Sequence, residues 1–153
     1  MFKKSLVAVL FSLIMAMVLG TSAFAAEDFQ PIKYYNAEEV TPEIAKALIE
    51  VEETNAKIFN EIEKAVVKYE KMHDKYNEEL IKHQDSAKQA KLTANYEKKS
   101  DELISQLKVK TEKMTLKGIE KAEKAGLVVE MYFVDVKFAD RTEAIDPILV
   151  VGW

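Results

Sequence analysis

Residues 44–80 read IAKALIEVEETNAKIFNEIEKAVVKYEKMHDKYNEEL, and they set the architecture of this 153-residue chain. One set of positions recurs at alternating steps of four and three residues, the heptad period of a helix that packs along a single stripe. An exposed apolar stripe of this length is not tolerated in water, so the pattern predicts a partner that covers it. Its positions are Ile44, Leu48, Val51, Asn55, Ile58, Ile62, Ala65, Tyr69, Met72 and Tyr76.

The helix that carries this stripe has clear start and stop signals. Thr41 is a capping residue, and Pro42 suits the first helical position because its missing N–H would have no partner there. The helix is expected to run to about His83. We place the reversal at residues 84–86, where Ser86 and Gln89 have the spacing of a capping box, with residues 92–95 as the alternative position.

A second helix is expected from about residue 87 to residue 125, ended by Gly126 in the left-handed conformation. Its stripe passes over Glu97 and Asp101, where we expect the register to slip. Residues 38–79 hold 12 acidic and 6 basic side chains, whereas residues 82–121 hold 10 basic and 6 acidic ones, which favours antiparallel pairing of the two helices. The expected stripe is Ala87, Ala90, Ala94, Ile104, Leu107, Thr111, Met114, Gly118, Ala122 and Ala125.

The last part of the chain changes character. Residues 127–138 are rich in Val, Tyr and Phe and predict a strand, residues 139–142 a turn, and residues 143–151 a second strand. Pro147 confines the second strand to an edge or to its own start. Because a two-stranded hairpin is marginal alone, it must pack on the base of the helices, gain a strand from residues 29–35, or pair with another subunit.

The predicted fold is therefore mainly α with a small β part. A long antiparallel, coiled-coil-like helical hairpin spans residues 41–126, and a C-terminal β-hairpin spans residues 127–153. A lead-in segment, residues 26–40, precedes the helices.

Residues 1–25 have the three parts of a secretory signal peptide: Lys3 and Lys4, an apolar run, and Ala23-Phe24-Ala25 at the cleavage site. We expect a secreted or extracytoplasmic protein, in the cell envelope or periplasm. From Ala26 onward the chain has 20 basic and 26 acidic residues, a net charge of −6, which disfavours nucleic acid as a partner. No later run is long enough for a transmembrane segment, and the chain has no cysteine, so packing alone must hold the fold.

Candidate catalytic and metal-binding residues are few. Glu70 and His73 have the Glu-x-x-His spacing of di-iron carboxylate bundles, but such a site needs a second motif and more helices, so a solvated histidine is favoured. No Gly-x-Ser-x-Gly elbow surrounds Ser86, Ser100 or Ser105, and no glycine-rich phosphate loop is present. We therefore assign no catalytic, cofactor-binding or metal residue and expect no cofactor and no enzymatic activity.

Two polar features stay open to more than one interpretation. Asn55 is either a tolerated polar residue that faces Thr115 or a water, or a residue that sets register and oligomeric state. Acidic residues and one arginine gather around the expected β-turn, but they lack the close, rigid spacing of a calcium site. They are Asp135, Asp140, Arg141, Glu143 and Asp146.

The order of leader, lead-in, long helical hairpin and terminal strands is similar in layout to the Skp-type periplasmic chaperones, which are basic where this chain is acidic. The similarity covers no specific residues. We expect an exported, non-enzymatic protein-interaction or structural protein with an unidentified protein partner, or one that forms a homo-oligomer. The alternatives are a holdase-type chaperone and a cell-wall or membrane-surface adaptor, the latter because residues 82–121 are locally basic.

Overall fold

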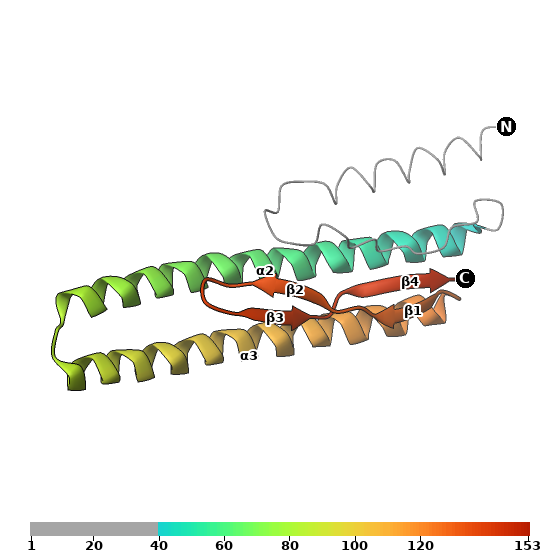
Figure 1. Cartoon of the computed structure of the whole chain (residues 1–153). Helices are drawn as coiled ribbons and strands as arrows, with labels where there is room; N and C mark the ends of the chain where they lie inside the picture. Colours follow the sequence, from blue (N-terminus) through green and yellow to red (C-terminus); the bar gives the residue numbers. More distant parts are fainter. Residues whose placement is uncertain (1–39) are drawn as a thin grey trace.

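The computed structural model of the chain describes residues 40–153, so the predicted leader and residues 26–39 of the lead-in lie outside the described residues. Two long antiparallel helices are followed by four short strands, which confirms the predicted fold class. Helix α2 spans Pro42–Lys82 and helix α3 spans Ser86–Lys124. The strands are β1 (Val128–Met131), β2 (Val134–Lys137), β3 (Thr142–Ile145) and β4 (Ile148–Gly152), and they lie along the helices (Figure 1).

The reversal between the helices lies at residues 83–85, the first of the two predicted positions. Thr41 caps α2 by accepting a hydrogen bond from the Ile44 N–H. Asp85, and not Ser86, caps α3 by accepting from the Lys88 N–H at 2.8 Å. The predicted capping box is therefore wrong: the Gln89 side chain instead donates to the His83 carbonyl at 2.8 Å, and so satisfies an orphan acceptor at the end of α2.

The predicted helix stop at Gly126 is confirmed. Gly126 has a φ of 93°, and its N–H donates to the Glu123 carbonyl at 3.0 Å. The Leu127 N–H donates to the Ala122 carbonyl at 3.0 Å. These two bonds form a Schellman motif, which satisfies the last carbonyls of α3 and turns the chain back toward the helices.

Each predicted strand is in fact two short strands. β1 pairs with β4 and β2 pairs with β3, both antiparallel, so the four strands form one long β-hairpin whose ladder is interrupted in the middle. At the interruption the Tyr132 N–H donates to the Pro147 carbonyl at 3.0 Å. Pro147, which cannot donate, comes directly before β4, as the sequence predicted.

The β-hairpin lies in the groove between α2 and α3, from their base to about the middle of their length (Figure 1). Of the three expected ways to stabilise the hairpin, packing on the helices is the one the described residues show, and the hairpin extends beyond the base. β1 and β3 lie on the α3 side while β2 and β4 lie on the α2 side, so the two strands of the hairpin exchange sides at the interruption, and β4 contacts both helices (Figure 1). A two-stranded ribbon has a strong right-handed twist, and breaking the ladder at residues 132–133 and 146–147 accommodates it.

The stripe of α2 packs against both α3 and this hairpin. One cluster joins Ile58, Ile62 and Tyr69 of α2 to Val134, Val136 and other residues of the β2–β3 half. A second cluster joins Leu48 and Val51 to Ile148 and Val150 of β4 and to Ala122 of α3. The heptad pattern thus indicated a buried face correctly, but a β-hairpin supplies much of the covering layer.

The predicted stripe of α3 is only partly correct. The register does slip near Glu97 and Asp101, where Tyr96 and Ser100 are the buried residues. Thr115 is fully buried where Met114 was expected, and Ala87, Ala90 and Ala94 are exposed. The buried positions of α3 follow steps of four, four and three, a period of 3.67 residues that keeps one face of a nearly straight helix toward the hairpin. They are Tyr96, Ser100, Ile104, Leu107, Thr111, Thr115, Gly118 and Ala122.

Side chains of opposite charge on the two helices form ion pairs across the α2–α3 contact. Lys110 Nζ lies 2.6 Å from Glu61 Oε2, and Lys121 Nζ lies 3.8 Å from Glu50 Oε2. These side chains are all at least partly exposed, and pairs that water can reach contribute a few tenths of a kcal/mol each. They favour the antiparallel pairing, while the buried clusters supply most of the stability.

Gly118 provides a test of how closely the hairpin approaches α3. A Cβ at this position would overlap Ile148 Cδ1 and lie 3.1 Å from Thr54 Cγ2. We therefore expect Gly118→Ala to lower the free energy of unfolding by about 1–3 kcal/mol in urea titrations, despite the better helix propensity of alanine. Gly152→Ala is the matched control, because its Cβ would make only ordinary contacts at 3.9 Å or more.

The same site allows a rescue. Ile148→Val removes Cδ1 and should make Gly118→Ala less costly than it is in the parent chain, so the two effects should not add. Additive effects in this double-mutant cycle would contradict the position of Ile148 between the helices.

Candidate functional site

The most concentrated group of polar side chains lies where the β-turn of the hairpin meets the middle of the helices. The Phe138 N–H donates to the Arg141 carbonyl at 2.8 Å, which makes Ala139 and Asp140 the central residues of a tight turn. The Asp140 carboxylate accepts a hydrogen bond from the Tyr69 hydroxyl at 2.5 Å and from the Tyr96 hydroxyl at 2.6 Å. We call Tyr69, Tyr96 and Asp140 the tyrosine–aspartate cluster.

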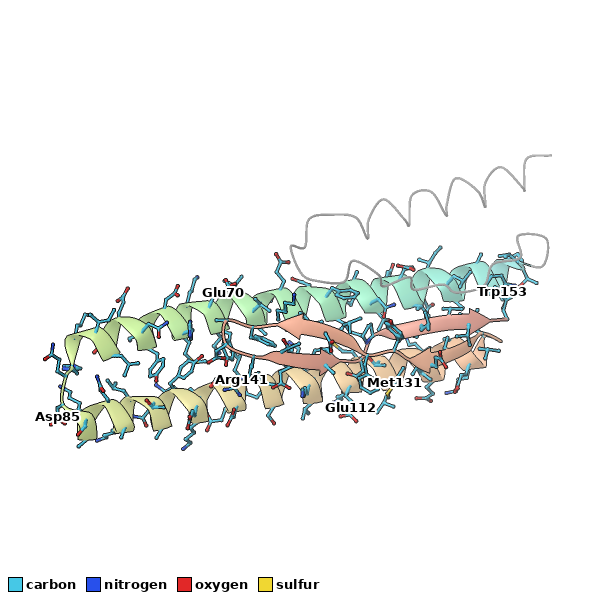
Figure 2. The ribbon with its side chains drawn as sticks, in the orientation of Figure 1. Glu70, Asp85, Glu112, Met131, Arg141 and Trp153 are labelled. Carbon is cyan, nitrogen blue, oxygen red and sulfur yellow. The ribbon has the colours of Figure 1, made fainter. Side chains whose placement is uncertain are left out.

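Arg141 completes the attachment of the turn. Figure 2 places it at the end of the hairpin that points toward the middle of the helices. Its guanidinium donates to Asp101 on α3 at 2.6 Å and lies over the Tyr69 ring, 5.8 Å from the centroid. The turn is therefore held to α3 by an ion pair, and to both helices by the two tyrosine hydroxyls.

In this cluster the Asp140 carboxylate faces two neutral donors, the hydroxyl groups of Tyr69 and Tyr96. Burial works to raise the pKa of Asp140, but the hydrogen bonds from Tyr69 and Tyr96 and the charge of Arg141 outweigh it and hold the pKa below its usual value. Burial, followed by the contact with Asp140, raises the pKa of both tyrosine hydroxyls. At neutral pH the cluster thus holds an ionised aspartate between two neutral phenols.

Aromatic rings extend this cluster toward the tip of the helices. The Tyr76 ring stacks on Tyr96 with centroids 4.4 Å apart, and the Tyr76 hydroxyl forms a 2.9 Å hydrogen bond with Thr93. The His73 ring lies 5.8 Å from Tyr96, and its nitrogens face Asn77 on the same helix. Beyond the β-turn, these rings take over the contact between α2 and α3.

A second polar site anchors the interruption of the hairpin. The Asn55 side chain donates to the Ile148 carbonyl at 2.8 Å and accepts from the Ile148 N–H at 2.9 Å. Thr115 on the facing helix donates to the Asp146 carbonyl. Asn55 does not face Thr115, as one interpretation expected; its amide pairs with the backbone of β4 as a neighbouring strand would, and so sets the register of the hairpin on α2. Its role in the oligomeric state stays a prediction.

The other residues named from the sequence do not come together. Glu70 is exposed and points away from the hairpin (Figure 2). Ser100 donates to the Tyr96 carbonyl within its own helix, and Glu143 pairs with Lys108 at 2.6 Å. In residues 40–153, no group of three or more His, Asp or Glu side chains is placed to hold a metal ion. Of the acidic residues around the β-turn, Asp140 and Glu143 have separate partners, so the group does not form one ligand shell.

One buried carboxylate lies outside both polar sites. Glu52 on α2 is only 9% exposed. Burial raises the pKa of its carboxyl to about 7. Asp146 is similarly buried, which raises the pKa of its carboxyl, and the nearby charge of Glu112 adds to this effect. Sequence analysis missed Glu52 because a glutamate on a Glu- and Lys-rich helix is normally solvated.

Large apolar side chains are exposed on β1 and on the segment that follows it. Phe133 is 64% exposed, Val128 is 57% exposed and Tyr132 is 41% exposed. All three belong to one six-residue stretch of β1 and the segment after it. Other exposed apolar residues lie on the helices and are spread over their length: Val67, Ile81, Val109 and Leu116.

Comparisons with known proteins give no identity for this fold. No family model, curated protein or solved structure matches the chain. In the described part of the chain, neither helix has a stretch apolar enough to cross a membrane.

The tyrosine–aspartate cluster predicts a pH-dependent contribution to stability. Tyr69→Phe and Tyr96→Phe should each lower the free energy of unfolding by about 1–2 kcal/mol at pH 7, because each removes a hydrogen bond to an ionised group. Since the pKa of Asp140 is lowered on folding, this stabilisation is present above about pH 4 and is lost as the pH falls through the folded-state value.

Tyr76→Phe is the matched control for that experiment. Its hydroxyl bonds a neutral threonine, so its smaller effect should not change between pH 7 and pH 3. A loss in Tyr69→Phe that stays equally large after the pH has fallen below the folded-state pKa of Asp140 would contradict the assigned ionisation of Asp140.

Glu52 predicts the opposite pH dependence. Its pKa rises from 4.5 to about 7 on folding, so its favourable contribution is present below about pH 4.5 and is lost as the pH rises to 7 and above. Glu52→Gln should therefore be more stable than the parent chain by about 1–3 kcal/mol at pH 8 and nearly equal to it at pH 4.5. Urea unfolding at both pH values measures this, with the exposed Glu53→Gln as control; a Glu52→Gln chain that keeps the parent's pH dependence would refute the assignment.

Proposed function

We propose that this chain is an exported, non-enzymatic protein-interaction protein built on a helical hairpin. The observation that carries the proposal is the exposure of Val128, Tyr132 and Phe133, three large apolar side chains within one six-residue stretch of the β-hairpin. Exposed apolar side chains grouped in this way often mark a contact site for another protein. Because the hairpin is fixed to both helices, this surface is presented on a rigid support, which lowers the entropic cost of binding.

The arrangement of polar groups supports a non-enzymatic role. Around the β-turn, the charged side chains are used to attach the hairpin: Asp140 is bound by two tyrosines, Glu143 by Lys108, and Arg141 by Asp101. A general base or nucleophile needs a free position next to it for a substrate, and a partner to activate it. The tyrosine–aspartate cluster supplies partners on both sides of the carboxylate, so we assign it a structural role.

Substitution of Phe133 tests the proposed surface. Phe133→Asp should reduce recovery of the partner at least tenfold in pull-downs from the organism's envelope fraction, while the thermal midpoint stays within about 2 °C, because the side chain is mostly exposed. Lys137→Asp changes an exposed residue of the same hairpin and should leave recovery unchanged. Equal recovery with Phe133→Asp and the parent chain would count against this surface.

Holdase activity is the second candidate function, because exposed aromatic side chains also bind unfolded chains. It predicts that the protein suppresses aggregation of an unfolded client without nucleotide, and that Phe133→Asp weakens the suppression. The absence of any effect at equimolar or higher ratio would remove this candidate. Light scattering on the eluted protein distinguishes a homo-oligomer, the other form of the proposal, from a monomer.

Export is proposed from residues 1–25 and has its own test. The protein recovered from outside the cytoplasm should have the mass of a chain that begins at Ala26. Replacing Ala25 with a bulky residue, as in Ala25→Trp, should block processing, because signal peptidase reads small residues there. A recovered mass that includes residues 1–25 would refute cleavage.

A further inference from the structure

Two neighbouring lysines of α3 locate the face of the helix pair that lies opposite the β-hairpin. Lys108 binds Glu143 on β3 at 2.6 Å, whereas Lys110 binds Glu61 on α2 at 2.6 Å. Two residues correspond to about 200° around a helix axis, so these lysines leave α3 in nearly opposite directions. The Glu61–Lys110 pair therefore lies across the α2–α3 contact on the side away from the hairpin. We call this side, with the residues in line with Glu61 and Lys110, the back face.

Lysines dominate the row of α2 that is in line with Glu61. Steps of three and four residues keep to one side of a helix. Between residues 57 and 75, such steps from Glu61 reach only lysines, and all of them are exposed. These lysines are Lys57, Lys64, Lys68, Lys71 and Lys75. At 1.5 Å per residue, the row is about 27 Å long.

The facing row of α3 is basic as well. Between residues 99 and 121, steps of three and four from Lys110 reach four exposed lysines and no acidic residue. These lysines are Lys99, Lys110, Lys117 and Lys121. Most lysines of the two rows form no ion pair with an acidic side chain of residues 40–153. The lysines without such a pair are Lys57, Lys68, Lys71, Lys75, Lys99 and Lys117.

Other acidic side chains of the same stretch of α2 lie off the back face. Each directly precedes a lysine of the row and is therefore about 100° or more around the helix axis from it. These residues are Glu63, Glu70 and Asp74. Glu102 and Glu120 border the row of α3, and each pairs with a lysine of its own helix. The back face thus carries a surplus of positive charge, although the net charge from Ala26 onward is −6.

The shape of the back face fits a flat partner. α2 and α3 run side by side (Figure 1), and the axes of packed helices are about 8–10 Å apart, so the two rows form a band of lysines. A bilayer surface with anionic lipids can contact both rows at once, whereas a linear polyanion follows a single line. Lysine side chains are long enough to bring their charges to the lipid headgroups. The same surface repels the negative charge of the rest of the chain, which fixes the orientation.

We propose that the back face of the α2–α3 pair docks on the surface of a bilayer that contains anionic lipids. The hairpin then faces away from the bilayer, and the exposed Val128 and Phe133 stay accessible to a protein. This inference does not rest on the proposed function, because it concerns a different surface and holds whatever the hairpin binds.

Vesicle co-sedimentation tests the proposal on the chain that begins at Ala26, which lacks the apolar leader. This chain should bind vesicles that contain phosphatidylglycerol at least tenfold more tightly than vesicles of phosphatidylcholine alone. The binding should weaken as added salt screens the charges. Equal affinity for both kinds of vesicle, or binding to neither, would overturn the proposal. Binding to soluble polyphosphate but to neither kind of vesicle would also overturn it, because a linear polyanion would then be the ligand.

Charge reversal tests whether the back face makes the contact. Lys68→Glu on α2 and Lys99→Glu on α3 should each weaken binding to the phosphatidylglycerol vesicles about tenfold. Lys137→Glu is the matched control: it makes the same change in net charge at an exposed position of the hairpin, and it should alter binding less than about twofold. Circular dichroism checks that each variant keeps its helices. Equal losses in all three variants would refute the assignment to the back face.

Phe133→Asp separates this inference from the proposed function. Phe133 lies on the hairpin, so the substitution should change vesicle binding less than about twofold, even though it is expected to reduce recovery of the protein partner. Loss of vesicle binding in this variant would place the bilayer on the hairpin side and would overturn the proposal.

Discussion

The structure depends on the pairing of the Asn55 side chain with the backbone of Ile148. An amide in the middle of an apolar stripe is unfavourable unless both its donor and its acceptor are used, and here both are, at 2.8 and 2.9 Å. The bonds are buried, so breaking them would leave unpaired groups on both partners. The result is a fixed register: Ile148, and no other residue of the strand, lies opposite Asn55.

The rest of the hairpin is placed by that register. Counting from Ile148 toward the β-turn, Thr115 meets the Asp146 carbonyl, Lys108 meets Glu143, and the two tyrosines meet Asp140. A two-stranded hairpin alone is marginal, and this one has a broken ladder. The helices stabilise it by covering its apolar face and by binding it through polar contacts near both the interruption and the turn. In return the hairpin covers the stripe that a two-helix arm would otherwise expose.

Much of this architecture could be predicted from the sequence, and the physical reasons differ by element. Helix ends follow from local chemistry, so Thr41, Pro42 and Gly126 located them well. The presence of strands was predicted from the Val- and Tyr-rich composition of the segment after Gly126. The layer that covers the α2 stripe could not be read in the same way, because a heptad of apolar residues looks the same whether a helix or a hairpin packs on it. The polar residues Asn55 and Thr115 on the buried faces were the available signal that backbone of another element packs on the helices.

The candidate sites show the same limit. Tyr69 was placed on the buried stripe, and Tyr96 beside the register slip, but nothing local connects them to Asp140, which is 71 and 44 residues away. Glu52 was missed because its burial depends on tertiary contacts, which the spacing of residues along one helix does not reveal. Glu70 and His73, whose spacing resembles that of a metal site, lie on a largely solvated face of α2. One such motif on one helix cannot build a metal site.

The central claim is that the hairpin of the same chain fills the groove between its own helices, with Ile148 inserted beside Gly118. Nuclear Overhauser effects between the Ile148 δ-methyl group and the α-protons of Gly118 test it most directly. In a sample that mixes labelled and unlabelled chains, the account predicts strong effects within one molecule and none between molecules. Their absence, or their appearance only between molecules, would contradict it.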